Sequence, residues 1–146
     1  SLIRALITEN KFNLALSYLN HPYLIIGKVV HGEHRGQKLG FPTANLKVPA
    51  DKLVPNYGVY SGFVTLNKQS LPAIIYIGSK PTYSHSASVI EVHILDFSAQ
   101  LYGKYLKVYL TSFIREQKVF KNSIELKTQI KKDITKIPPC IDFTGL

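Results

Sequence analysis

The sequence predicts a mainly β protein, an antiparallel barrel with short helical segments at both ends. Between positions 23 and 112, apolar or alternating runs follow one another at spacings of about ten to twenty residues. Most of these runs have no long helical pattern between them. This arrangement favours an antiparallel barrel over a parallel sheet of strand–helix–strand units. The length of 146 residues fits one domain.

The first 20 residues are expected to be helical. Apolar residues recur at helical spacing in residues 2–7. Asn10 is expected to end a first helix, because asparagine tolerates a left-handed C-cap. A second helix is expected to end at His21-Pro22, since the residue before a proline avoids helical geometry.

Five strands are expected from the residue pattern. In the fourth of them, Ile90 and Val92 should face the core, and Glu91 and His93 the other side. In the last strand Leu106 should face the core. Residues 67–70 are expected to form the turn between the second and third strands. The five predicted strands are residues 23–30, 58–66, 71–77, 88–97 and 105–112.

A last helix is expected from about Asn122. Asn122 and Glu125 have the spacing of a capping box. Leu126, Ile130 and Ile134 form one apolar stripe, which is expected to pack on the barrel. Two prolines at positions 138 and 139 are expected to end this helix.

The charge balance favours anionic partners. Lysine and arginine number 18 against 9 acidic residues, which gives a net charge of +9. The lysines are scattered, and the densest group lies on the expected solvent face of the last helix, so nucleic acid is not an expected partner. The longest fully apolar runs are about five residues, whereas a membrane helix needs about 20. Cys140, the single cysteine, cannot form a disulfide within the chain, which suits the cytoplasm.

The most unusual segment is residues 32–45. It contains three glycines, at positions 32, 36 and 40, together with Arg35 and Lys38. Glycines let backbone N–H groups approach an anion closely, so such a loop can bind phosphate. It is neither a Walker A motif nor a dinucleotide-binding fingerprint. From composition alone, a phosphate-binding loop and a plain surface loop stay equally open.

Three side chains are candidates for the chemistry. Thr43 and Asn45 offer hard oxygen ligands two residues apart, as Mg²⁺ prefers, although a simple turn is also open. Glu91 lies in the middle of a strand, where acidic residues are disfavoured. It can be an exposed strand residue or a base that accepts a hydroxyl proton.

Taken in order, these segments resemble the riboflavin kinase family. The resemblance covers about residues 22–136, and its most specific part is Gly-Phe-Pro-Thr-Ala-Asn at positions 40–45. The other blocks are Leu-Val-Pro with Gly-Val-Tyr (53–60), Ile-Gly with Pro-Thr (77–82), Glu-Val-His-Ile-Leu-Asp-Phe (91–97), Leu-Tyr-Gly (101–103) and the stretch from Arg115 to Phe120.

The resemblance implies a six-stranded antiparallel Greek-key barrel with a C-terminal helix. It also implies transfer of the γ-phosphoryl group of ATP to the 5′-hydroxyl of riboflavin, giving FMN and ADP, with Mg²⁺ assisting and Glu91 as the base. Thr43 and Asn45 would bind the Mg²⁺. The residues implied for the nucleotide are Gly32, Lys38, Gly40, Phe41, Pro42 and Thr43, and those implied for the flavin are Arg115, Lys118 and Phe120.

The resemblance also sets expectations for the domains. Residues 1–21 resemble the helical connector of bacterial bifunctional riboflavin kinase/FAD synthetases, in which a nucleotidyltransferase domain precedes the kinase domain. The expected division is a connector (1–21), a kinase domain (22–137) and a tail (138–146), and this chain is not expected to make FAD alone. Tyr76 is a departure, because bacterial members often have asparagine there.

Two other functions were weighed. The first is a flavin- or nucleotide-binding module without activity, and the presence of Thr43, Asn45 and Glu91 argues against it. The second is an RNA-binding barrel, which needs aromatic and basic residues interleaved along strands. Tyr105, Lys107 and Tyr109 offer only a faint version of that pattern.

Overall fold

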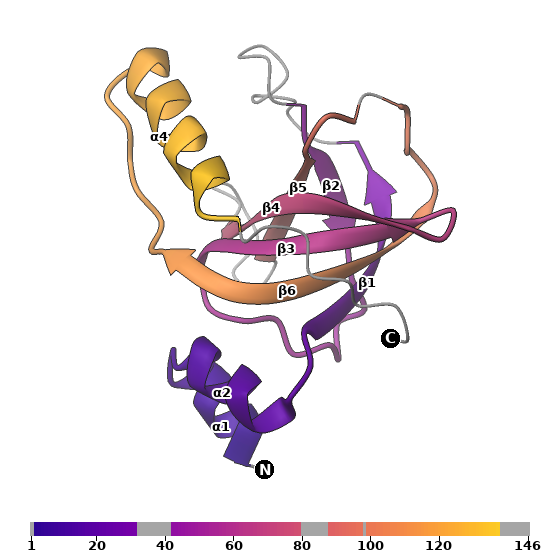
Figure 1. Cartoon of the computed structure of the whole chain (residues 1–146), viewed down its shortest axis with the longest axis vertical. Coiled ribbons are helices and arrows are strands. Elements are labelled where there is room, and N and C mark those ends of the chain that lie inside the picture. Colours follow the sequence, from indigo (N-terminus) through magenta and orange to yellow (C-terminus); the bar gives the residue numbers. More distant parts are fainter. Residues whose placement is uncertain (1, 32–41, 80–87, 98, 138–146) are drawn as a thin grey trace.

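The protein is a closed antiparallel β-barrel of six strands, as predicted, in the computed structural model (Figure 1). The structure describes residues 2–31, 42–79, 88–97 and 99–137, and all that follows concerns these residues. The strands lie in the order β1-β2-β5-β4-β3-β6, and β6 closes the barrel against β1. The strands are β1 (Tyr23–Val30), β2 (Ala44–Lys47), β3 (Gly58–Leu66), β4 (Gln69–Ser79), β5 (Ser88–Ile94) and β6 (Tyr105–Arg115).

Three helices lie outside the barrel. They are α1 (Leu2–Thr8), α2 (Phe12–Leu19) and α4 (Ser123–Thr135). Figure 1 shows α1 and α2 together on one side of the barrel and α4 on another side, after β6. No helix in the described ranges is long and apolar enough to cross a membrane.

The pattern missed one strand, β2. It has only four residues, and Asn45, at its second position, is polar, so its alternation is too short to be recognised. Tertiary pairing forms this strand, because β2 is bonded to β1 on one side and to β5 on the other. The bounds of β1 and β3 were predicted correctly.

The turn between β3 and β4 is shorter than predicted. Asn67 and Lys68 form it alone, with φ angles of 48° and 66°, and the ladder continues to the pair Leu66–Gln69. Two left-handed residues match the twist of a hairpin better than a four-residue turn does. For this reason β4 begins two residues before the predicted strand.

Two other strand ends differ from the prediction. β5 stops at Ile94, three residues early, and Asp96 then has a φ of 53°. β6 continues to Arg115, with irregular pairing to β3 on either side of Ser61. At Gly62 a Cβ would collide with the carbonyl oxygen of Tyr109, so only glycine allows these two strands to approach so closely.

The interior of the barrel is apolar. The predicted inward residues of β5 and β6 all belong to one buried cluster, and the α1–α2 hairpin covers part of it. Phe12 of α2 packs edge-on against Tyr60, with ring centroids 4.9 Å apart. Asn10 separates the two helices with a φ of 64°, as predicted. α2 ends earlier than predicted, because Asn20 forms a left-handed C-cap before the proline.

The N-terminus of α4 is capped as the sequence predicts. The Asn122 side chain accepts a hydrogen bond of 2.9 Å from the backbone N–H of Glu125. The Glu125 carboxylate accepts from Lys121 N–H instead of completing the box at Asn122. Ile130 is buried, and α4 ends at Thr135, before the two prolines, which lie outside the described residues.

Candidate functional site

The two strongest candidates from the sequence lie side by side. Asn45 of β2 and Glu91 of β5 are directly opposite partners in the antiparallel ladder. Their chain neighbours Leu46, Ile90 and Val92 belong to the core, so both side chains point to the outer face. Asn45 is buried there and Glu91 is half-buried. An amide and a carboxylate at this spacing can act on one ligand.

The strand start beside this pair is fixed by a buried histidine. His93 Nδ1 lies 2.8 Å from the carbonyl oxygen of Pro42. A carbonyl only accepts, so this nitrogen carries the proton and donates. The bond ties β5 to the segment that carries Thr43, which is half-buried. The sequence predicted that His93 shares the face of Glu91, but its contact with Pro42 could be found only in the structure.

The Asn45–Glu91 pair belongs to a longer row of aligned residues. Across the ladder, Glu91 faces Tyr76 of β4, Tyr76 faces Val59 of β3, and Val59 faces Arg115 of β6. We call these five residues, from Asn45 to Arg115, the outer row. It runs over the outside of the barrel from the predicted metal and base residues to the first predicted flavin residue.

At one end of the outer row, an ion pair joins the barrel to α4. Arg115 donates from Nε and Nη2 to the two carboxylate oxygens of Asp133, each at 2.8 Å. The Asp133 side chain is 1% exposed and that of Arg115 14%. Gln129 adds a third hydrogen bond to Asp133 at 3.0 Å. Asp133 was not predicted from the sequence, because an acidic residue on a charged helix gives no sign that it is buried.

The other two predicted flavin residues lie in the segment between β6 and α4. The Phe120 ring lies 5.9 Å from the Arg115 guanidinium carbon, in a cation–π arrangement. Lys118 is exposed and donates to Gln129 at 3.3 Å. Gln117 lies so close to β4 that a Cβ at Gly78 would be 2.7 Å from its side-chain nitrogen. Phe120, by direct contact, and Lys118, through Gln129 and Asp133, therefore lie at the Arg115 end of the outer row.

Four predicted nucleotide residues cannot be placed. Gly32, Lys38, Gly40 and Phe41 lie outside the described residues. Pro42 and Thr43, which follow them, lie directly before β2. The role of the loop before β2 therefore stays a prediction.

The donor set suits a hard cation held together with phosphate. No group of three or more histidine, cysteine or acidic side chains that could hold a metal occurs in the described part of the chain. Asn45 instead offers a buried amide oxygen, and Thr43 offers a hydroxyl two residues before it. Mg²⁺ usually has few protein ligands and keeps water and substrate phosphate, so these two residues fit it.

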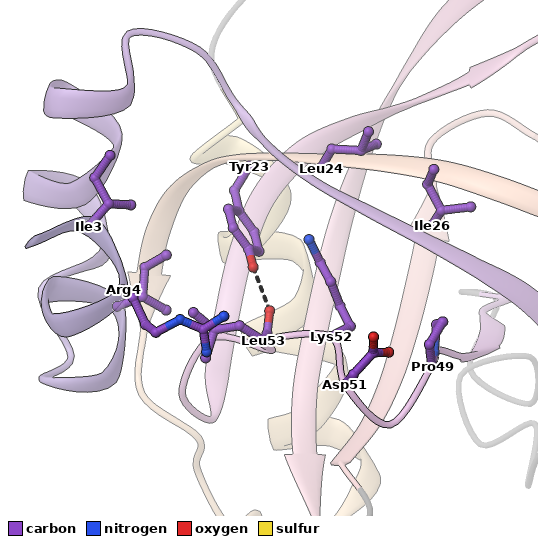
Figure 2. Close-up of a pocket in the computed structure, with 10 residues that line it drawn as sticks. Ile3, Arg4, Tyr23, Leu24, Ile26, Pro49, Asp51, Lys52 and Leu53 are labelled. Carbon is purple, nitrogen blue, oxygen red and sulfur yellow. Dashed lines mark hydrogen bonds between the residues drawn. The ribbon is translucent and has the colours of Figure 1, made fainter. Parts of the chain in front are cut away.

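A separate hollow of the surface lies away from the outer row. A cavity of about 540 Å³ is bounded by α1, by β1 and by residues 49–53. Figure 2 shows Arg4, Tyr23 and Lys52 around it, with the Tyr23 hydroxyl bonded to the carbonyl oxygen of Leu53. Burial lowers the pKa of Lys52. None of the predicted site residues lines this cavity, which lies apart from the outer row.

Comparison with known sequences finds bacterial relatives that are named as riboflavin kinases with a second activity. The bifunctional riboflavin kinase/FMN adenylyltransferase of Escherichia coli K12 is 41% identical over 133 residues, which are 90% of this chain and 42% of the relative. The protein of the same name from Bacillus subtilis 168 is 36% identical over 136 residues, 91% of this chain and 43% of the relative. The chain thus spans less than half the length of these relatives.

Comparison with solved structures supports the fold. A Streptococcus pneumoniae protein described as a macrolide-efflux protein superposes with a TM-score of 0.84 at 33% identity, over 91% of this chain and 44% of its own. A riboflavin kinase from Trypanosoma brucei superposes with a TM-score of 0.57 at 27% identity, over 79% of this chain and 76% of its own.

The family model gives the same result as the relatives. The Flavokinase model, described as riboflavin kinase, matches residues 19–140, which include all six strands and α4. The chain therefore belongs to the riboflavin kinase family and carries its kinase domain.

Proposed function

We propose that this chain transfers the γ-phosphoryl group of ATP to the 5′-hydroxyl of riboflavin on the outer face of the barrel, giving FMN and ADP. The observation that carries the proposal is the direct pairing of Asn45 with Glu91 across β2 and β5. This pairing would place the Asn45 oxygen, as a ligand of the metal, next to the Glu91 carboxylate, as the base. Family membership supports these substrates, and the position of the pair supports this place of reaction.

Glu91 is the base in this proposal. Its carboxylate accepts the proton of the riboflavin hydroxyl as the oxygen attacks the γ-phosphorus and the bond to the β-phosphate oxygen breaks. The neighbouring strands hold the carboxylate in place, since the backbone on both sides of β5 is hydrogen-bonded. Phosphoryl transfer depends mainly on such alignment and on charge neutralisation.

Asn45 and Thr43 would hold Mg²⁺ through their side-chain oxygens. When bound, the ion would neutralise phosphate charge. The protein contributes the rigid placement of these ligands: Asn45 is fixed in β2, and the His93–Pro42 hydrogen bond fixes the approach to that strand. The glycine-containing loop that precedes Pro42 in the sequence would hold the phosphates of ATP.

Arg115, Lys118 and Phe120 would border the flavin. Arg115 is the end of the outer row farthest from Asn45, and the aromatic ring of Phe120 beside it offers a surface for the flavin ring. Riboflavin would then lie along the outer row, with its 5′-hydroxyl at Glu91 and its ring near α4.

The test is a direct assay of the purified chain with riboflavin, ATP and Mg²⁺, in which the flavins are separated by chromatography. The proposal predicts FMN that forms only when all three are present. Flavin binding without FMN, from folded protein and with several divalent metals, would refute it in favour of a binding module. Because relatives carry a second activity in their names, the same run should also be checked for FAD, which we do not expect from this chain.

A further inference from the structure

One buried hydroxyl in the outer row has no partner. The Tyr76 oxygen is shielded from solvent, and no hydrogen bond to it occurs among the residues that the structure describes. The fully buried phenol of Tyr60 differs, because its hydroxyl donates to the carbonyl oxygen of Asn56 at 2.6 Å. Leaving such a group unpaired costs about 1–3 kcal/mol, so it calls for an explanation.

The surroundings of Tyr76 are those of the proposed site. The phenol stands on the outer face between Glu91 on β5 and Val59 on β3. Burial is the main cause of a raised pKa at Tyr76, and the Asp133 carboxylate raises the pKa further. Arg115 lowers this pKa, and Glu91 raises it. The hydroxyl is therefore a neutral donor close to both ends of the proposed riboflavin position.

Strand spacing indicates which part of riboflavin lies beside it. Neighbouring strands are about 4.8 Å apart, so Tyr76 lies one spacing from Glu91, and Arg115 lies two spacings beyond Tyr76. With the 5′-hydroxyl at Glu91, the next groups along the molecule are the other ribityl hydroxyls. The flavin ring comes only after them, nearer to Arg115.

We propose that the Tyr76 hydroxyl forms a hydrogen bond with a ribityl hydroxyl of riboflavin. It would thereby select flavins that carry a ribityl group. The inference rests on the proposed function, since it needs riboflavin in the outer row. The acceptor would reach the phenol as side chains at the border between barrel and α4 move apart. Gln129 and Lys118 line that border, and both have long side chains with several rotatable bonds.

The test compares Tyr76→Phe with Tyr60→Phe. Losing one hydrogen bond from Tyr76 should raise the Kd and KM for riboflavin about two- to tenfold. The same change should leave the melting temperature equal or higher, because an unpaired hydroxyl has been removed. Tyr60→Phe should do the reverse, lowering the melting temperature and leaving the riboflavin KM unchanged.

A second ligand locates the contact. Lumiflavin has a methyl group in place of the ribityl chain, and its binding can be followed by flavin fluorescence. Tyr76→Phe should leave lumiflavin affinity unchanged. An equal loss for both ligands would place the phenol at the ring and overturn the ribityl assignment.

The failure of this inference and that of the proposed function are distinguishable. Unchanged riboflavin KM and Kd in an active Tyr76→Phe variant would overturn the role of Tyr76 alone. A wild-type chain that makes no FMN would overturn the proposed function, and with it the position of the acceptor on which the inference rests.

Discussion

At the scale of single residues, the site depends on which side chains the ladder places opposite one another. Asn45 and Glu91 are 46 positions apart in the numbering, yet they are direct partners. Glu91 was chosen from the sequence as an acid in the middle of a predicted strand, and Asn45 as an oxygen ligand two residues after Thr43. The sequence could not show that β2 pairs with β5, and this pairing is what brings the two side chains next to each other.

Replacing Glu91 by glutamine tests the base. The amide keeps the shape of the side chain but cannot accept the proton, so we expect turnover to fall at least about tenfold while ATP still binds. The rate of FMN formation and a separate ATP-binding measurement check this. Glu9→Gln, a change of the same kind at an exposed position near α1, is the control and should have no effect. Wild-type turnover in Glu91→Gln would remove Glu91 from the mechanism.

Replacing Asn45 by alanine tests the metal ligand. The loss of a side-chain oxygen should weaken Mg-ATP more than riboflavin, because only the nucleotide binds through the ion. Titrations of both substrates at several Mg²⁺ concentrations check this. Equal weakening of the two substrates would contradict a specific metal role and indicate a disturbed fold.

The contacts that support the site were harder to predict than the site. Asp133 is a buried partner of Arg115, but in the sequence it is one charged residue of a lysine-rich helix. Tyr76 was recognised only as a departure from what bacterial relatives often carry. Whether a polar side chain is buried depends on which segments pack over it, and such long-range packing leaves no local pattern.

At the scale of elements, α4 is attached through few polar contacts. The Arg115–Asp133 ion pair fastens it to β6, and the pair is nearly closed to solvent. A buried pair contributes little net stability when intact, but removing one partner leaves an unpaired charge. The position of α4 is therefore sensitive to a single substitution.

Asp133→Asn should destabilise the chain by about 3 kcal/mol, because Arg115 keeps its charge and loses its counter-charge. Urea unfolding measures this. Glu116→Gln, which removes one negative charge from an exposed position two residues before Lys118, should change stability by less than about 0.5 kcal/mol. Equal effects of the two variants would show that the ion pair is not what makes Asp133 important.

The hairpin between β3 and β4 allows a prediction in the stabilising direction. Lys68 has a φ of 66°, which glycine adopts at lower cost than lysine. We expect Lys68→Gly to raise stability by about 0.5–1 kcal/mol, an increase of several degrees in melting temperature. Gln69→Gly, one position later inside β4, should lower stability instead. A lower melting temperature in Lys68→Gly would mean that the lysine side chain stabilises the turn.

Strand prediction succeeded where the pattern was long and failed where it was short. Residues 23–30 and 58–66 were predicted with their full bounds because each is a run of eight or nine residues rich in apolar, β-branched and aromatic types. β2 was missed because four residues cannot establish a period. The ends of β4, β5 and β6 were misplaced, since turns and bulges set them and not side-chain alternation.

At the scale of the whole molecule, buried phenols make stability depend on alkaline pH. Burial raises the pKa of Tyr60 above its ordinary value of 10.0, and burial together with nearby carboxylates does the same at Tyr76. The folded chain then keeps protons that the unfolded chain loses. Their contribution is therefore present in full below about pH 10 and is lost as pH rises further.

We expect the free energy of unfolding to fall between pH 9 and pH 11, because the unfolded state alone ionises these phenols. Urea titrations over this interval measure the slope. Tyr60→Phe should show a shallower slope than the wild type, whereas exposed Tyr105→Phe should not. Identical slopes in all three proteins would refute this account.

Closure of the barrel also has a consequence for the order of events during synthesis. β1 pairs with β6, so Tyr23 is opposite Leu110. The first and the last strand of the sequence must therefore meet to close the barrel. Every earlier strand can pair with at least one neighbour before then, but the circle cannot close until β6 has left the ribosome. Long-range pairing of this kind is slow, since much chain must be ordered before the contact is made. During that wait β1 and β3 each present an open edge, and this nascent intermediate is the state of the chain most exposed to aggregation.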